Sequence, residues 1–261
     1  MGRAPGYSPK QRMVLSWWRT PGVRERYDAV ICDGAVRSGK TYCTALSFLL
    51  WALCRQPGQN VALCGKTILS LRRNLASPLF ERLRGLGCSV QEVRSQNLAR
   101  VELGSRQVQV YLFGGRDESS AALIQGMTLA GVLFDEVALM PRSFVEQALA
   151  RCSAEGATFW FSCNPEHPEH WFYKEWIQKR EQHRALYLHF TMEDNPSLSP
   201  ECRDCIREFG LYCWAEGDRE RPRKDFDHAM DELRYFVLYQ EGRERRGGFY
   251  AAGVRRRGGR L

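Results

Sequence analysis

A glycine-rich motif constrains the fold of this chain more than any other feature. Residues 34–41 read GAVRSGKT and match G-x-x-x-x-G-K-[ST] at every fixed position. The apolar run Tyr27–Asp33 comes directly before the motif, and a helical pattern from Lys40 to Arg55 follows it. A strand, a glycine-rich loop and a helix in this order are typical of a phosphate-binding loop, in which backbone N–H groups surround a phosphate at a helix N-terminus.

The motif predicts a nucleotide site and the role of its residues. Lys40 is expected to reach the β- and γ-phosphates, and the Thr41 hydroxyl is expected to bind Mg²⁺. A second fragment, CGKT at 64–67, lacks the upstream glycine and is interpreted as a turn at the end of a strand. The predicted phosphate-binding residues are Gly34, Ala35, Val36, Arg37, Ser38, Gly39, Lys40 and Thr41.

Short apolar runs alternate with longer helical patterns along the first 190 residues. Several runs are almost continuously apolar, as expected for strands of a parallel sheet that is covered by helices on both faces. The predicted architecture is a three-layer α/β sandwich with a mainly parallel central sheet. The expected strands are Tyr27–Asp33, Asn60–Gly65, Gln107–Phe113, Gly131–Asp135, Thr158–Cys163 and Ala185–Phe190, and the expected helices are Lys40–Arg55, Ile68–Leu86 and Ser143–Cys152, the last with Ser143 as its N-cap.

Two acids end the fourth of these strands. The run VLFDE places Asp135 and Glu136 at its carboxyl end, about 95 residues after the phosphate-binding loop. A bound nucleotide needs a carboxylate in the Mg²⁺ shell, and a hydrolase needs a second one to orient and deprotonate water. Asp135 is therefore the predicted metal residue and Glu136 the predicted catalytic base. Without the loop, the same acids would be interpreted as solvated residues at a strand end.

The fifth strand also ends in polar residues, in the run FSCNP. Ligands of this fold class lie at the carboxyl ends of strands, so Ser162 or Asn164 is a candidate to contact the γ-phosphate. The alternative is a strand that simply turns at Asn164-Pro165.

Longer blocks of the sequence resemble the ATPase domain of the large terminase subunit of tailed bacteriophages, of the kind found in prophages of Gram-positive bacteria. The resemblance runs from about Ser8 to about Ser199. It is carried by YDAVICDGAVRSGKT, CGKT followed by SLRRN, YLFGGRDESS followed by IQGMTLAGVLFDEVALMP, FSCNPEHPEHWF and LYLHFTMEDNPSLS.

This resemblance implies a P-loop NTPase fold of the RecA or ASCE type and an ATP-driven, Mg²⁺-dependent motor that moves double-stranded DNA into a procapsid. It implies a small terminase subunit, a portal protein and a homo-oligomeric ring as partners. It also assigns a catalytic role to Arg37, adenine recognition to Gln11 and the coupling motif to Ser162, Cys163 and Asn164. Taken alone, Arg37 would be a solvated loop residue and Gln11 a helix-surface residue.

The family pattern breaks after Ser199. Large terminases resemble one another in a second, RNase H-like nuclease domain, but only about thirty residues separate Ser199 from a segment that resembles its last helix, with an acidic site on Asp227 or Asp231. We therefore expect an ATPase domain over 1–199, a truncated nuclease remnant with a charged linker over 200–241, and an Arg/Gly-rich disordered tail over 242–261. Within the remnant, the charged run 216–225 is interpreted as the linker or as an exposed turn.

The middle of the nuclease domain is expected to be missing, and this decides whether the chain can cut DNA. Nuclease activity is expected to be absent, with Asp227 and Asp231 vestigial. The alternative function is a prophage remnant that binds nucleotide without driving packaging. A metabolic P-loop kinase fails to explain the paired acids.

The net charge and the cysteines bear on the binding partners and on the cellular compartment. The tail 242–261 holds seven arginines against one glutamate and so accounts for +6 of the net charge of +8; it is interpreted either as a solvated end or as a nucleic-acid tether. The apolar runs are too short to cross a bilayer, and the first ten residues do not form a signal peptide. Cys32, Cys43, Cys54 and Cys64 lie in apolar stretches and are expected to be buried, which favours a reduced cytosolic setting. The resemblance implies that this is the cytoplasm of a bacterial host. Cys202 and Cys205 with nearby Cys213 have the spacing of half a zinc site, for which coincidence is the favoured interpretation.

Overall fold

An eight-stranded sheet organises the first of the two units into which the chain divides, Met1–Pro196 and Ser197–Leu261. The computed structural model describes residues 6–35, 37–164, 167–198, 214–215 and 218–222. The strand order is β3-β4-β5-β2-β6-β7-β1-β8. The strands are β1 (Ala29–Gly34), β2 (Asn60–Gly65), β3 (Ser89–Val93), β4 (Leu98–Leu103), β5 (Arg106–Gly114), β6 (Gly131–Phe134), β7 (Thr158–Ser162) and β8 (Ala185–Phe190).

Six of these strands run parallel and form the body of the sheet. β5, β2, β6, β7, β1 and β8 pair in parallel, whereas β3 and β4 add an antiparallel hairpin beyond β5. The predicted α/β class with a mainly parallel sheet is confirmed. All carboxyl ends of the parallel strands lie at the same edge of the sheet, which is where this fold class binds ligands.

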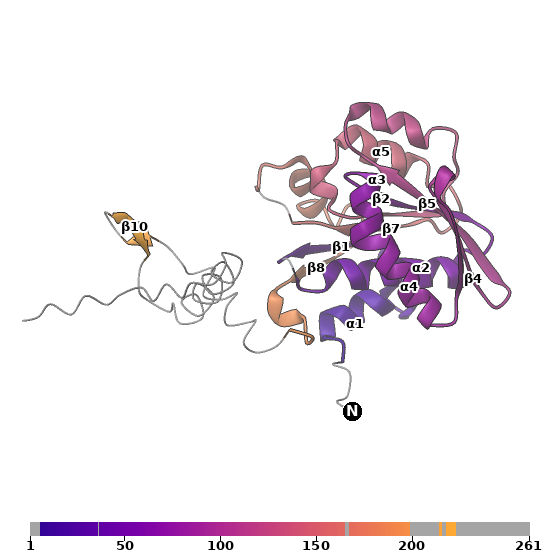
Figure 1. The fold of residues 1–261 in the computed structure, drawn as a ribbon, viewed down its shortest axis with the longest axis horizontal. Helices are drawn as coiled ribbons and strands as arrows, with labels where there is room; N and C mark the ends of the chain where they lie inside the picture. The colour runs from indigo at the N-terminus through magenta and orange to yellow at the C-terminus, as the bar shows by residue number, and fades with distance from the viewer. Residues whose placement is uncertain (1–5, 36, 165–166, 199–213, 216–217, 223–261) are drawn as a thin grey trace, which may run out of the picture. The chain divides into compact units, whose positions relative to one another are not determined.

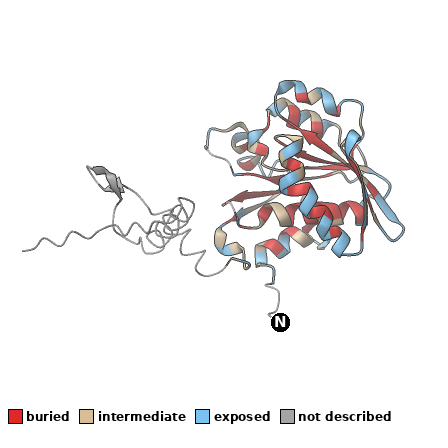
Figure 2. Ribbon diagram, in the orientation of Figure 1, coloured by how far each residue is buried: buried red, intermediate tan, exposed pale blue. Residues whose placement is uncertain are grey.

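Helices cover both faces of the sheet (Figure 1). α1, α2 and α4 lie on one face and α5 on the other, and the buried side chains accordingly form two clusters, one on each face. Figure 2 shows the strands buried between these layers. The α-helices are α1 (Pro9–Ser16), α2 (Lys40–Arg55), α3 (Ile68–Leu71), α4 (Ser77–Gly85) and α5 (Arg142–Ala150); π-helical turns occupy η2 (Arg72–Ala76) and η6 (Tyr173–Ile177), and 3₁₀ turns occupy η1 (Trp17–Arg19), η3 (Arg94–Gln96), η4 (Glu118–Ile124), η5 (Val137–Leu139) and η7 (Met192–Asp194).

The core beneath α2 is built on a group of aromatic rings. Trp160 on β7 lies 4.8 Å from Trp51 on α2 and 5.2 Å from Trp17, measured between ring centroids. Phe48 completes the group at 5.1 Å from Trp160. These fully buried rings fix α2 against the sheet and thereby fix the loop at its N-terminus.

Several local predictions need correction. α5 begins at Arg142 with Pro141 at the N-cap position, so Ser143 lies inside the helix and its hydroxyl contacts Glu118 instead. The expected helix over 68–86 is divided by the π-helical turn η2. Cys54 is exposed, because it lies on the outer side of the last turn of α2, whose Ala52 and Leu53 are buried; Cys32, Cys43 and Cys64 are buried as expected. All seven cysteines among the described residues are free.

The described part of the second unit is a short antiparallel pair, β9 (Trp214–Ala215) with β10 (Asp218–Pro222). The interpretation of the charged run 216–225 as a linker or exposed turn is therefore wrong for 218–222. Strand pairing uses backbone groups and so tolerates charged side chains, and Pro222 stands at the strand end, where its missing N–H matters least.

Several predicted features cannot be placed. Cys202, Cys205, Cys213, Asp227, Asp231 and the tail 242–261 lie outside the described residues. In the described ranges, no helix has the length and apolar character that a bilayer crossing requires.

Candidate nucleotide site

The loop between β1 and α2 has the backbone that a phosphate-binding loop needs. Gly34, Arg37 and Gly39 have φ angles of +109°, +60° and +80°. A Cβ on Gly34 would lie 2.1 Å from the backbone oxygen of Phe190, and one on Gly39 would lie 2.6 Å from Nε2 of Gln11. Gly34 is therefore required by both conformation and space, whereas Gly39 is required by its left-handed φ, since the Gln11 side chain can move away from a Cβ. The predicted binding residue Val36 lies outside the described residues.

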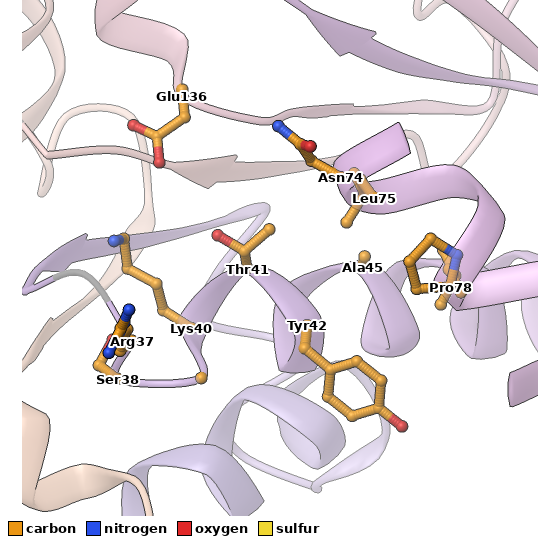
Figure 3. Close-up of a pocket in the computed structure, with 12 residues that line it drawn as sticks. Arg37, Ser38, Lys40, Thr41, Tyr42, Ala45, Asn74, Leu75, Pro78 and Glu136 are labelled. Atoms are coloured by element: carbon orange, nitrogen blue, oxygen red, sulfur yellow. The ribbon is translucent and has the colours of Figure 1, made fainter. Parts of the chain in front are cut away.

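A cavity of about 290 Å³ opens where the loop meets the first turn of α2 (Figure 3). Gly39 is the N-cap of α2 and leaves the first N–H groups of that helix available to an anion. Residues of the loop, of α2 and of the segment η2–α4 surround the cavity together with one acid. The lining consists of Arg37, Ser38, Gly39, Lys40, Thr41, Tyr42, Ala45, Asn74, Leu75, Pro78, Leu79 and Glu136.

Lys40 and Thr41 lie at the floor of this cavity. Lys40 is only 3% exposed, and its Nζ donates to the carbonyl oxygen of Ala35 at 3.3 Å. In Figure 3 the side chain of Lys40 extends toward that of Glu136, with the Thr41 hydroxyl beside them. The cation and the hydroxyl predicted from the motif thus occupy one site with the predicted base.

Asp135 and Glu136 are fixed by the neighbouring strand. Both follow β6, and the Ser162 hydroxyl at the end of β7 donates to Asp135 Oδ1 at 2.9 Å. The same Ser162 oxygen accepts from the Glu136 N–H at 3.3 Å. Glu136 has φ +57° and ψ +54°, a left-handed conformation that redirects the chain directly after Asp135.

Burial and the charge of Glu136 raise the pKa of Asp135 above its ordinary value. The hydrogen bond from Ser162, the charge of Lys40 and a hydrogen bond with Thr41 act in the opposite direction and favour the carboxylate. Asp135 therefore interacts electrostatically with Thr41, Lys40 and Ser162. Its ionisation depends on each of these neighbours.

The donors present suit Mg²⁺. Thr41 and Asp135 supply one hydroxyl and one carboxylate oxygen, and Mg²⁺ prefers oxygen ligands while keeping positions for water and substrate phosphates. Within the described part of the chain, no group of three or more His, Cys, Asp or Glu side chains is placed to hold a metal by itself. A Mg²⁺ ion here would therefore depend on the phosphates that it accompanies.

Arg37 and Gln11, to which the resemblance assigns roles, occupy different positions relative to the cavity. Arg37 lines the cavity. Gln11 is 4% exposed; its Nε2 donates to the Ser38 carbonyl at 3.2 Å, and its Oε1 accepts from the Ser8 N–H at 3.1 Å. Gln11 therefore joins α1 to the phosphate-binding loop, and its reading of adenine stays a prediction.

The three residues of the expected coupling motif have three different environments. Ser162 contacts both acids, as described above. Cys163 is buried in the core, where its N–H donates to the Cys32 carbonyl at 3.0 Å and burial raises the pKa of its thiol, whereas Asn164 is exposed. Of the three, Ser162 is the residue that the structure brings into the site.

Sequence reasoning missed two asparagines. Asn74 reaches the cavity from the π-helical turn η2, which no periodicity indicated. Asn195 donates from Nδ2 to the Arg37 carbonyl at 2.6 Å, although 158 positions separate the two residues. The only signal was that each asparagine stands in a family-like block, Asn74 in SLRRN and Asn195 in LYLHFTMEDNPSLS.

Comparisons with known proteins agree with this geometry. The family model described as "Terminase large subunit, T4likevirus-type, N-terminal" matches residues 31–221. The large terminase of a thermophilic bacteriophage is 47% identical over 78% of this chain and 50% of that chain, with a TM-score of 0.75. The same terminase in complex with ADP is 44% identical over 77% of this chain and 50% of that chain, with a TM-score of 0.75.

A more distant structure supports the fold alone. The ATPase domain of the Thermus phage P74-26 large terminase is 18% identical over 83% of this chain and 90% of that chain, with a TM-score of 0.56. The present chain spans about half the length of the thermophilic phage terminase. A search of curated proteins found no match.

Proposed function

The chain belongs to the family of large terminase subunits, and from that membership we propose that it is an ATP-hydrolysing motor that drives double-stranded DNA into a phage procapsid. The observation that carries the proposal is that Lys40, Thr41 and Glu136 line one cavity, with Asp135 hydrogen-bonded to Thr41 directly behind them. The similarity to a terminase whose structure contains ADP supports a nucleotide at this cavity.

The proposed reaction is hydrolysis of ATP to ADP and inorganic phosphate. Glu136 accepts a proton from a water molecule, whose oxygen attacks the γ-phosphorus as the bond to the bridging oxygen of ADP breaks. Lys40 and the N–H groups at the start of α2 stabilise the negative charge on the phosphate oxygens, and Arg37 adds a second cation from the loop. Thr41 and Asp135 would hold Mg²⁺, which neutralises phosphate charge when bound.

Ser162 is proposed as the residue through which the site senses the state of the nucleotide. Its hydroxyl contacts Asp135 and the backbone of Glu136, so a change at the γ-phosphate that moves either acid reaches β7 directly. The neighbouring Cys163, bonded to β1, belongs to the same proposed coupling segment, together with Asn164.

The partners of this activity are proposed from the family. They are double-stranded DNA, a small terminase subunit and the portal protein of the procapsid, with several copies of the chain forming a ring in the bacterial cytoplasm. The proposed domain organisation keeps the ATPase domain at 1–199, with 200–241 as the remnant of a nuclease domain and 242–261 as a basic tail.

ATP turnover with and without double-stranded DNA tests this proposal. A motor is stimulated by DNA, whereas a prophage remnant that only binds nucleotide is not, and a metabolic kinase requires a small acceptor. Stimulation by linear duplex DNA supports the motor. Turnover that DNA leaves unchanged contradicts it in favour of the remnant.

We also propose that this chain does not cleave DNA. A two-metal cut needs several carboxylates fixed around ions about 3.5–4 Å apart, and Asp227 and Asp231 are expected on a single helix. Supercoiled plasmid should therefore stay intact with Mn²⁺ or Mg²⁺ in excess. Nicking that disappears in Asp227→Ala or Asp231→Ala would contradict the proposal.

A further inference from the structure

Side chains from outside the cavity hold the carbonyl groups of the phosphate-binding loop. The Arg37 carbonyl accepts from Asn195 Nδ2 at 2.6 Å, and the next carbonyl, that of Ser38, accepts from Gln11 Nε2 at 3.2 Å. Gln11 belongs to α1 and Asn195 follows η7, so the two donors reach the loop from segments that are far apart in sequence. Two successive carbonyls of the loop are therefore satisfied by protein side chains.

The carbonyl that Asn195 holds belongs to a residue in an unfavourable conformation. Arg37 has φ +60°, which is disfavoured for a residue with a Cβ, and Gly39 two positions later has φ +80°. Left-handed residues at intervals in a loop are the feature that gathers successive N–H groups into an anion-binding concavity. A bond that fixes the Arg37 carbonyl therefore also fixes the orientation of the peptide that it shares with Ser38, whose N–H lies on the opposite side of that peptide.

The segment that carries Asn195 is itself anchored. Asp194 forms an ion pair with Lys10 on α1, with 2.8 Å between Oδ2 and Nζ, and the same oxygen accepts from the Thr191 N–H at 2.8 Å. Burial alone would raise the pKa of Asp194, but the bonds from Lys10 and Thr191 outweigh it and lower this pKa. Asp194 stays ionised at neutral pH, so Asn195 is held in place next to the loop.

We propose that Asn195 is a positioning residue for nucleotide binding, which holds the Arg37 carbonyl away from the cavity so that the loop N–H groups and the Arg37 side chain face the phosphates. The inference rests on the proposed function, because it assumes that the cavity binds a nucleotide. It assigns to Asn195 no contact with that nucleotide. The effect of Asn195 is therefore on affinity, through the shape of the loop.

The test is calorimetric titration of the full chain with ADP at pH 7.5. Asn195→Ala should weaken binding by about 2- to 10-fold, the range expected for one hydrogen bond. Asn195→Asp keeps the size of the side chain but replaces the donor by a carboxylate that faces a carbonyl oxygen, so it should bind ADP at least as weakly as Asn195→Ala.

A pH series separates positioning from a general structural effect. As the pH falls from 7.5 toward 5, the carboxyl introduced by Asn195→Asp gains a proton that it can donate to the Arg37 carbonyl, so its affinity relative to wild type should recover. The Lys10–Asp194 ion pair adjoins this position and Arg37 supplies the carbonyl, and all three residues are the same in each variant. Asn97→Asp is the matched control, because Asn97 uses its side-chain oxygen to accept from Arg72 and keeps that ability as Asp.

The possible outcomes separate failure of the inference about Asn195 from failure of the proposed function. Wild-type ADP binding with an unchanged affinity in Asn195→Ala overturns the inference and leaves the proposed function standing. The ADP affinity of Asn195→Asp, divided by that of wild type, should change with pH. If this ratio stays constant, as expected for Asn97→Asp, the inference is also overturned. A wild-type chain that fails to bind ADP overturns both.

Discussion

The Ser162 hydroxyl at the end of β7 donates to the Asp135 carboxylate at 2.9 Å and accepts from the N–H of Glu136 at 3.3 Å. One hydroxyl on a neighbouring strand thus fixes both acids of the candidate site. The hydrogen bond lowers the pKa of Asp135, whereas burial and the charge of Glu136 raise it, and the net direction is upward. Ser162 therefore offsets part of the rise in the pKa of Asp135 and favours the carboxylate form, which is the form that can bind a cation.

This balance predicts the pH dependence of Mg²⁺ binding. The carboxylate form of Asp135 binds the ion, and a proton competes with it, so Mg²⁺-dependent ADP affinity should fall as the pH drops toward the raised pKa. Ser162→Ala removes a bond that favours the carboxylate, so the fall should begin at higher pH, and Mg²⁺ affinity at pH 6 should drop by about tenfold. Titrations of Mg²⁺–ADP between pH 8 and 5 measure both effects.

Ser143→Ala is the matched control, because the Ser143 hydroxyl contacts Glu118 on α5's side of the sheet and not the acids of the site. Its pH profile should follow that of wild type. A Ser162→Ala profile that also overlays wild type would remove Ser162 from its role in tuning Asp135.

Gly34→Ala should destabilise the chain strongly. The new Cβ would lie 2.1 Å from the Phe190 backbone oxygen at a φ of +109°, and the same oxygen accepts from the Ala35 N–H at 2.9 Å. Backbone atoms of two paired strands cannot move apart without disrupting their ladder, so we expect a decrease of about 2–4 kcal/mol in the free energy of unfolding. Chemical denaturation measures this decrease.

Gly87→Ala separates the steric clash from the backbone strain. Gly87 has a similar φ of +88°, but a Cβ there would meet nothing within 4 Å. The free energy of unfolding of that variant should fall by only about 1–2 kcal/mol, the cost of a left-handed conformation. Equal decreases in the two variants would show that the approach of Phe190 to Gly34 is unimportant.

The arginine-rich tail should add non-specific affinity for DNA. Its seven arginines bind phosphates without reading bases, so deletion of residues 242–261 should weaken binding equally for different duplex sequences. The slope of log affinity against log salt should flatten by about 0.9 for each phosphate that the tail neutralises. Replacement of the seven arginines by lysine keeps the charge and should keep the slope. An unchanged slope after deletion would identify the tail as a solvated end.

The sequence predicted well those parts of the fold in which local pattern and packing agree. The helix Lys40–Arg55 and the strand Asn60–Gly65 have the expected bounds, because each combines a clear period with a defined end. The hairpin of β3 and β4 was missed, since β3 (SVQEV) is short and its side chains are exposed or only half-buried. Its stability comes from pairing with β4, which a local pattern does not reveal.

The candidate site was predictable to the extent that a motif names its residues. Lys40, Thr41, Asp135 and Glu136 follow from types and spacing that are tied to one chemistry, and they meet at one cavity or in direct contact with its lining. Asn195 and Asn74 could not be found in this way. An asparagine has no preferred spacing from its partner, and the bond from Asn195 to Arg37 depends on the parallel pairing of β8 with β1, which brings the two segments together.

ATP hydrolysis by wild type, Glu136→Gln and Lys40→Ala, measured together with ADP affinity, tests the proposed ATPase site most directly. Glu136→Gln removes the base but keeps the size of the side chain, so hydrolysis should fall by about 100-fold or more while ADP affinity stays close to that of wild type. Lys40→Ala removes the buried cation and should lower both. If Glu136→Gln hydrolyses ATP at the wild-type rate, Glu136 is not the base, and the assignment of this cavity as the ATPase site is contradicted.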